Sequence, residues 1–184
     1  MMKTISLAIL FLLVVSGSNL SAQETRQSDK HNYSERYGNT LNLGLGVGGY
    51  SGYYGYVGHS LPVFNINYEF GVAKNFTLAP FATIYSYHDN YYRETVIPIG
   101  GKGTYYFDQA LGASSDWDFY LAGSLGFAMV STTWDNGYYR DNNYHSVNPL
   151  FLDFHLGAEY HLSRKVGLFL DLSTGVSTIG LAFH

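Results

Sequence analysis

Apolar and polar residues alternate with a period of two along much of the chain. Between residues 41 and 48, Leu41, Leu43, Leu45 and Val47 alternate with asparagine and glycine. Successive strand residues point to opposite faces, so this segment is predicted to be a β-strand with one apolar face. In the segment 76–87 both phases contain apolar residues, so the alternation does not decide which of the two faces outward. The same alternation predicts further strands near residues 64–72, 76–87, 97–107, 119–129, 150–160, 168–173 and 179–183.

The connections between these segments alternate in length. Those near 51–61, 88–94 and 131–147 are long and rich in tyrosine, whereas those near 73–75 and 162–165 are tight. Membrane barrels show this alternation, with short turns on the periplasmic side and longer loops outside. An even number of antiparallel strands also returns both ends of the chain to the same side.

The N-terminal segment has the three parts of an export signal. Lys3 supplies a positive charge, residues 5–15 are mostly apolar, and a small, polar stretch leads to a cleavage site after Ala22 or, alternatively, after Gln23. The predicted organisation is a signal peptide at 1–22, a flexible periplasmic lead-in at 23–39 and a barrel at 40–184.

Composition favours a membrane barrel over a soluble domain. Charged residues make up only 13% of the chain, against about 25% in soluble domains. Glycine (21 residues) and tyrosine (18) are abundant, and cysteine is absent. A net charge of −4 gives no indication of nucleic-acid binding. The predicted fold class is therefore all-β, an eight-stranded antiparallel up-and-down transmembrane β-barrel preceded by a signal peptide.

The chain resembles the small outer-membrane β-barrel domain family, of the eight-stranded outer-membrane protein A/X type, in a glycine- and tyrosine-rich Bacteroidetes style. The resemblance lies in LNLGLGVGGY at 41–50, IPIGGKGTYYF at 97–107 and LFLDFHLGAEYHLSRKVGLFLDL at 150–172. It implies location in the cell outer membrane, contact with outer-membrane lipid and lipopolysaccharide, and insertion by the barrel-assembly machinery. Members usually end on an aromatic residue, whereas His184 follows Phe183 here.

Several ionisable residues fall on the polar phase of the predicted strands. A barrel of this size is filled by its own side chains, so buried charges must pair, and Lys102 is expected to pair with one or two carboxylates. His155 and His161 lie about 20 Å apart along one strand, so they cannot share an ion. No metal site and no cofactor are expected. The predicted interior polar network is Glu69, Lys102, Asp153, His155, Glu159 and Asp171.

The predicted loops contain one weak catalytic candidate and many aromatic residues. In Tyr144-His145-Ser146 the histidine and serine are neighbours, which point to opposite sides of an extended chain, so no catalytic group is expected. Tyrosine-rich loops make adaptable contact surfaces that suit a glycan or a protein. The predicted external-loop aromatics are Tyr53, Tyr54, Tyr56, Tyr91, Tyr92, Trp134, Tyr138 and Tyr139, with Tyr50 and Tyr85 beside them.

These features predict a monomeric integral outer-membrane barrel with a structural or surface-adhesive role, without catalytic activity or an open pore. Two alternatives remain open. One is a lipid A-modifying outer-membrane enzyme, and the other is a soluble periplasmic barrel that binds an apolar ligand in the manner of lipocalins. The lipocalin-like alternative requires the leucines inside and the charged residues outside.

Overall fold

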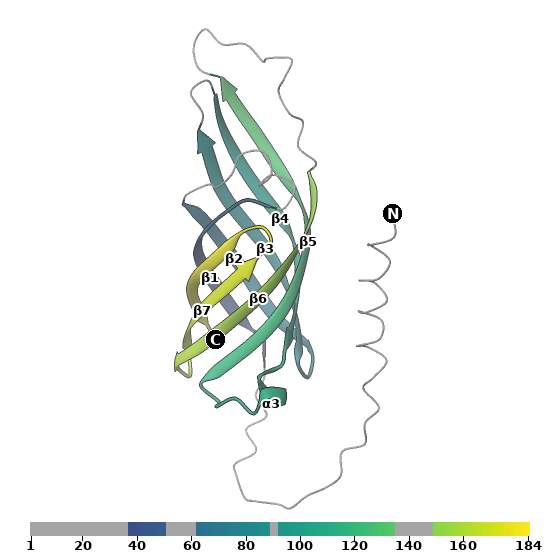
Figure 1. Cartoon of the computed structure of the whole chain (residues 1–184), viewed down its shortest axis with the longest axis vertical. Coiled ribbons are helices and arrows are strands. Elements are labelled where there is room, and N and C mark those ends of the chain that lie inside the picture. Colours follow the sequence, from purple (N-terminus) through teal and green to yellow (C-terminus); the bar gives the residue numbers. More distant parts are fainter. Residues whose placement is uncertain (1–36, 51–61, 89–91, 135–148) are drawn as a thin grey trace, which may run out of the picture. The chain divides into compact units, whose positions relative to one another are not determined.

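Eight strands and one short helix make up the described part of the chain. The computed structural model describes residues 37–50, 62–88, 92–134 and 149–184 (Figure 1). The elements are β1 (Thr40–Val47), β2 (Val63–Ala73), β3 (Phe76–His88), β4 (Tyr92–Tyr106), α3 (Asp108–Leu111), β5 (Trp117–Trp134), β6 (Leu150–Ser163), β7 (Val166–Ser173) and β8 (Ser177–Phe183).

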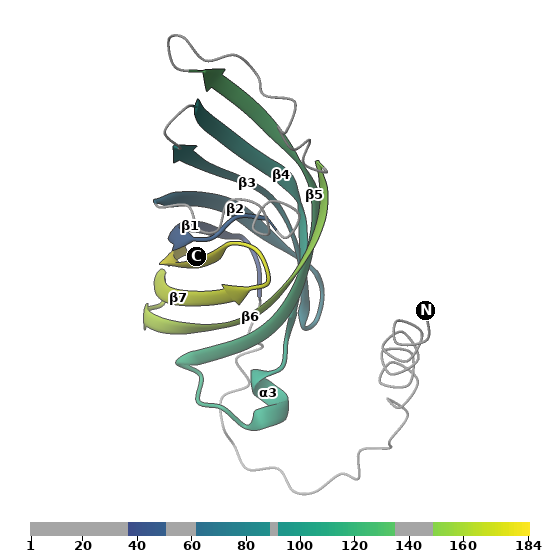
Figure 2. The ribbon, with the colours of Figure 1, turned by 45° about the horizontal axis from the view of Figure 1, so that its top comes forward.

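The strands form a closed antiparallel barrel in sequence order, β1 to β8, and Figure 2 shows them curving around a common axis. The closing pair joins β1 to β8, with Leu41 opposite Phe183 and Gly46 opposite Thr178. Closure removes the unpaired edges that an open sheet would expose. The predicted eight-stranded up-and-down architecture is confirmed.

The two ends of the barrel differ in their connections. The start of β1, the end of β8 and the connections β2–β3, β4–β5 and β6–β7 lie at one end, which we call the turn end. The helix α3 belongs to the β4–β5 connection and stops at Gly112, which has a left-handed backbone (φ 64°). No helix among the described residues has the length and apolar character needed to cross a membrane. The opposite end, which we call the loop end, carries two long connections, β1–β2 and β5–β6, and two short ones, β3–β4 and β7–β8. The long connection predicted near 88–94 is therefore wrong, because β3 continues to His88 and β4 begins at Tyr92.

Apolar side chains face outward and charged side chains face inward. On β6, Leu152, Phe154 and Leu156 are 53%, 58% and 52% exposed, whereas Asp153 and Glu159 are 4% and 5% exposed. The same alternation holds on β1, β2 and β7. The soluble lipocalin-like alternative requires the opposite orientation and is wrong for this barrel.

The structure settles the facing of β3, which the alternation left open. One phase of β3 is buried inside and consists of Thr77, Ala79, Thr83 and Tyr85. Leu78 and Ile84, on the other phase, face outward. Pro80 is on the outward phase and exposed. The inward phase therefore contributes hydroxyl groups to the interior, and the aliphatic phase continues the apolar outer surface.

Two residues predicted in external loops lie in strands instead. Tyr92 begins β4 and Trp134 ends β5, they oppose one another in the ladder, and their ring centroids are 5.2 Å apart. The clear apolar alternation ends near Met129, but pairing continues through threonines, which suit strands as well. The other predicted loop aromatics lie outside the described residues: Tyr53, Tyr54, Tyr56, Tyr91, Tyr138 and Tyr139.

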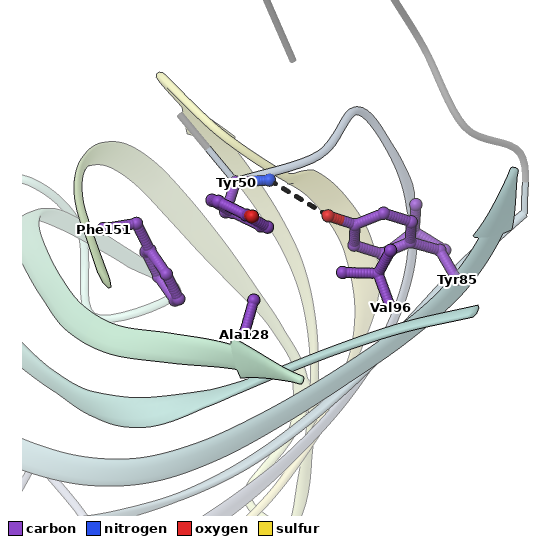
Figure 3. Close-up of a cluster of buried hydrophobic side chains, with 6 residues drawn as sticks. Tyr50, Tyr85, Val96, Ala128 and Phe151 are labelled. Atoms are coloured by element: carbon purple, nitrogen blue, oxygen red, sulfur yellow. Dashed lines mark hydrogen bonds between the residues drawn. The ribbon is translucent and has the colours of Figure 1, made fainter. Parts of the chain in front are cut away.

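An apolar cluster fills the interior near the loop end (Figure 3). Tyr50, predicted as a loop aromatic, is only 1% exposed, and its backbone N–H donates to the hydroxyl of Tyr85 at 3.3 Å. The ring of Phe151 lies 5.2 Å from that of Tyr50, centroid to centroid. The cluster therefore forms an apolar layer of the interior near the loop end. The cluster consists of Tyr50, Val63, Tyr85, Val96, Ala128 and Phe151.

One glycine makes room for an interior aromatic ring. Gly157 on β6 lies directly opposite Tyr120 on β5, and a Cβ at this position would overlap the tyrosine ring. The substitution Gly157→Ala should therefore displace Tyr120 and lower the free energy of unfolding by about 1–3 kcal/mol, the usual range for overpacking. Urea titration of the folded protein in lipid vesicles, followed by tryptophan fluorescence, measures the change.

Gly123 provides the matched control for this prediction. It lies on the outward phase of β5, and a Cβ there would meet nothing within 4 Å. Gly123→Ala should change the free energy of unfolding by less than about 0.5 kcal/mol. Equal effects of the two substitutions would contradict the described packing of Tyr120.

Candidate functional site

The ionisable residues predicted for the interior do lie inside the barrel, but in separate groups. Glu69, Lys102, Asp153, Glu159 and Asp171 are all buried, and the His155 side chain is 12% exposed. Lys102, His155 and Asp171 meet near the middle of the barrel. The remaining carboxylates line the same interior cavity but have different hydrogen-bond partners.

Asp171 is the centre of the middle group. Its Oδ2 forms an ion pair with Lys102 Nζ and accepts a hydrogen bond from Tyr120 OH at 3.2 Å. Its Oδ1 lies 2.7 Å from Nδ1 of His155. Lys102 Nζ also lies 5.0 Å from the centroid of the Tyr120 ring. The pairing expected for Lys102 is present, and the group around Asp171 joins four strands, β4 to β7.

Glu69 is satisfied by neutral donors rather than by a cation. Its Oε2 accepts hydrogen bonds from Tyr106 OH and Thr77 Oγ1, both at 2.7 Å, and its Oε1 accepts one from Asn42 Nδ2 at 3.0 Å. Sequence reasoning missed these donors. Their signal was present, since Asn42 and Tyr106 both fall on the inward phase of their strands.

The other two carboxylates lie toward opposite ends of the barrel. Asp153 accepts a hydrogen bond of 3.4 Å from Thr174 Oγ1, in the short β7–β8 connection. Glu159 lies at the turn end, 2.7 Å from Nε2 of His184. Next to it, His161 Nε2 lies 3.0 Å from Asp118 Oδ2. Sequence reasoning missed Asp118 and His184 as members of this group.

A Ser-His-Asp arrangement connects three neighbouring strands in the middle group. Ser124 Oγ lies 2.9 Å from His155 Nε2, and His155 Nδ1 lies 2.7 Å from Asp171. This is the order of contacts found in hydrolytic triads, with the serine and the carboxylate on opposite nitrogens of the ring. The sequence contains no local motif for it, because the three residues come from β5, β6 and β7. The weaker candidate, Tyr144-His145-Ser146, lies outside the described residues.

Three features of the surroundings oppose nucleophilic catalysis at Ser124. The ammonium of Lys102 already neutralises the carboxylate of Asp171, which would otherwise stabilise a protonated histidine. The interior cavity beside these residues has a volume of about 50 Å³, which suits ordered water rather than an acyl chain. Both neighbouring strands pair with β5 around Ser124, so its backbone N–H groups belong to the ladder and leave no oxyanion hole.

Comparison with known proteins finds likenesses of structure alone. No family model matches the chain, and no curated protein matches it. Neisserial surface protein A is 15% identical, with a TM-score of 0.46 over 78% of this chain and 93% of that one. The Yersinia pestis outer membrane protein Ail, in a phospholipid bilayer nanodisc, is 10% identical, with a TM-score of 0.46 over 79% of this chain and 98% of the other. The N-terminal β-barrel domain of Pseudomonas aeruginosa OprF is 11% identical, with a TM-score of 0.43 over 79% and 97% of the two chains.

The buried ion pair makes a prediction for stability. Lys102→Met should lower the free energy of unfolding by about 3 kcal/mol, because it leaves the carboxylate of Asp171 buried without its cation. The double substitution Lys102→Met/Asp171→Asn removes that charge as well and should recover part of the loss. Urea titration in lipid vesicles measures both. A Lys102→Met variant as stable as the unsubstituted protein would show that the two charges are not buried together.

Proposed function

We propose that the chain is an integral outer-membrane protein whose barrel anchors tyrosine-rich loops in a structural or surface-adhesive role. The observation that carries the proposal is the orientation of the strands, with leucines outside and carboxylates inside. Soluble proteins rarely expose large continuous apolar surfaces. A bilayer supplies the apolar surroundings that this surface requires.

The outward surface is apolar around the whole circumference. Each strand contributes exposed aliphatic or aromatic side chains, such as Leu45 on β1, Phe64 on β2, Leu125 on β5, Leu170 on β7 and Ile179 on β8. The charged side chains of β2 and β7, Glu69 and Asp171, point inward and accept hydrogen bonds there. The free energy of transfer into lipid therefore favours insertion over dispersal in water.

A ring of outward aromatic residues near the turn end supports the proposed membrane boundary. Tyr68, Tyr105, Trp117 and Tyr160 are each more than a third exposed and lie near the turn-end limits of β2, β4, β5 and β6. Trp117 and Tyr160 oppose one another in the ladder, with ring centroids 4.9 Å apart. Tyrosine and tryptophan favour the membrane–water interface, so we place the interface at this level.

The proposed location is the outer membrane, with the turn end toward the periplasm. A closed barrel behind an export signal suits this membrane, where lipopolysaccharide and other lipids would surround it and the barrel-assembly machinery would insert it. The two long connections, β1–β2 and β5–β6, leave from the loop end and would then face outward, available to a glycan or protein ligand. That the protein belongs to the Bacteroidetes type of these barrels is a prediction from the sequence resemblance.

The interior supports an anchoring role rather than conduction. The apolar cluster around Tyr50 and Phe151 crosses the barrel near the loop end, and the polar groups fill the space below it. Eight strands enclose a space that side chains can fill. Because the closed sheet needs no second chain to complete its hydrogen bonding, we propose a monomer without an open pore.

A charge on the outer belt distinguishes a membrane barrel from a soluble one. Leu170→Arg places a cation on β7, where the side chain is exposed among other leucines, and should destabilise the inserted barrel by about 2–4 kcal/mol. Leu111→Arg makes the same substitution on α3, at the turn end, and should have little effect. The measurements are fractionation of expressing cells and the heat-dependent mobility of the folded protein on a denaturing gel.

The expected result is an outer-membrane, heat-modifiable protein whose folding is impaired by Leu170→Arg alone. A chain recovered in the soluble periplasmic fraction, with both variants equally well folded, would overturn the proposed function. That outcome would mean that the outward leucines tolerate water.

A second candidate function is acyl-ester hydrolysis of a lipid by Ser124, His155 and Asp171, as in a lipid A-modifying enzyme. The hydrogen-bond contacts from serine to histidine to aspartate favour this function. The small cavity and the ion pair of Asp171 with Lys102 oppose it. We expect no labelling of the folded protein by a fluorophosphonate probe. Labelling that disappears in the Ser124→Ala variant, together with altered lipid A in cells expressing the protein, would establish the enzyme instead.

A further inference from the structure

A cluster of two histidines and a carboxylate lies in the mouth of the barrel at the turn end. Glu159, His161 and His184 each direct one ligand atom toward the others, and these three atoms lie within 4.8 Å of one another. We propose that these residues bind a Zn²⁺ ion. The inference rests on the geometry of the barrel mouth and does not depend on the proposed role in the membrane.

The observed distances suit an ion that bridges the three side chains. Glu159 Oε1 lies 2.7 Å from His184 Nε2 and 4.0 Å from His161 Nδ1. Around Zn²⁺, nitrogen and oxygen ligands at about 2.0–2.2 Å in tetrahedral geometry lie about 3.4 Å from one another. Binding therefore requires the Glu159–His184 distance to lengthen and the Glu159–His161 distance to shorten, each by less than about 1 Å. The ligand atoms of His161 and His184, at most 4.8 Å apart, must also approach to about 3.4 Å.

The second nitrogen of each histidine already has the partner that a zinc ligand requires. His161 Nε2 lies 3.0 Å from Asp118 Oδ2, and His184 Nδ1 lies 3.1 Å from Thr40 Oγ1. The carboxylate of Asp118 holds a proton on Nε2 of His161, as in the recurrent carboxylate–histidine–zinc series. The hydroxyl of Thr40 can accept a hydrogen bond from Nδ1 of His184 once Nε2 gives up its contact with Glu159 and binds the ion. Glu159 Oε1, His161 Nδ1 and His184 Nε2 are thereby left as the ligand atoms.

The strand geometry explains why these side chains converge. Glu159 and His161 are two residues apart on β6 and share its inward face. His184 continues the inward phase of β8 beyond Ala182, and its backbone N–H donates to the carbonyl of Lys165 at 3.0 Å. Between these strands, Gly167 on β7 has no side chain, and a Cβ there would overlap the carboxylate of Glu159. The glycine lets Glu159 reach across β7 toward His184.

An ion can reach this cluster from solution. The residues line an open pocket of about 110 Å³ at the turn end, together with Tyr37, which stacks on Tyr106 at 4.2 Å between ring centroids. The side chains of His161 and His184 are each 24% exposed. Three protein ligands leave a fourth tetrahedral position, which water can occupy from the pocket.

The sequence-based expectation of no metal site considered a different set of ligands. It paired His161 with His155, six residues away on the same strand, and the structure places those two histidines in separate groups. The actual partner, His184, is 23 residues from His161 in the chain.

Zinc binding by the full chain, prepared without a histidine tag and folded in detergent micelles, tests the proposal. Isothermal titration with Zn²⁺ should show one ion per chain, and Co²⁺ in its place should give the visible absorption of a tetrahedral site. His161→Gln and His184→Gln should each abolish stoichiometric binding. Asp118→Asn, which changes only a supporting contact, should weaken the affinity by about 10–100-fold and keep the stoichiometry.

His88→Gln is the matched control, because His88 lies at the far end of β3 and outside the cluster. It should bind Zn²⁺ as the unsubstituted chain does. Heat-dependent gel mobility shows that each variant is folded before titration, so a folding failure is not counted as a loss of binding. Absence of stoichiometric binding to the folded unsubstituted chain, or binding that survives both His161→Gln and His184→Gln, would overturn the proposal.

Discussion

The outward orientation of the apolar side chains is the constraint on which the rest of the structure depends. Once the leucines of a closed barrel face outward, every polar and charged side chain of the opposite phase must be accommodated within a narrow interior. There it loses most of its contact with water, and the lost solvation must be replaced by other side chains. Lys102, Glu69 and Asp171 show two solutions, one by opposite charge and one by several neutral donors.

The interior meets this requirement in layers. Toward the loop end, Tyr50 and Phe151 fill the space with apolar rings and need few polar partners. In the middle, Asp171 combines a lysine, a histidine and a tyrosine around one carboxylate. At the turn end, histidines and carboxylates meet beside an open pocket. Each layer therefore has a different balance of charge, and the histidine side chains of the last layer are more exposed than that of His155.

The sequence predicted the orientation of the strands but not the pairings inside them. A period of two shows which residues share a face, so the inward position of Asp153 or Lys102 follows from pattern alone. Contacts across strands depend on register and on the tilt of the barrel, which the sequence does not reveal. Ser124, His155 and Asp171 are brought together only by those two properties. Strand length was underestimated for a similar reason, because Tyr92 and Trp134 pair beyond the last apolar alternation.

A narrow polar interior readily produces arrangements that resemble functional sites. Each histidine ring has two nitrogens that require partners, so a buried histidine among serines and carboxylates easily acquires the contacts of a triad. Histidine exposure and charge balance separate the two arrangements here, since the side chain of His155 is 12% exposed and those of His161 and His184 are each 24% exposed. The triad of Ser124 lies beside a cavity of about 50 Å³, and its carboxylate is already paired with Lys102. At the turn end, by contrast, Glu159 and two histidines border a pocket of about 110 Å³. The first arrangement has the features of a structural network, and the second has those of a ligand site.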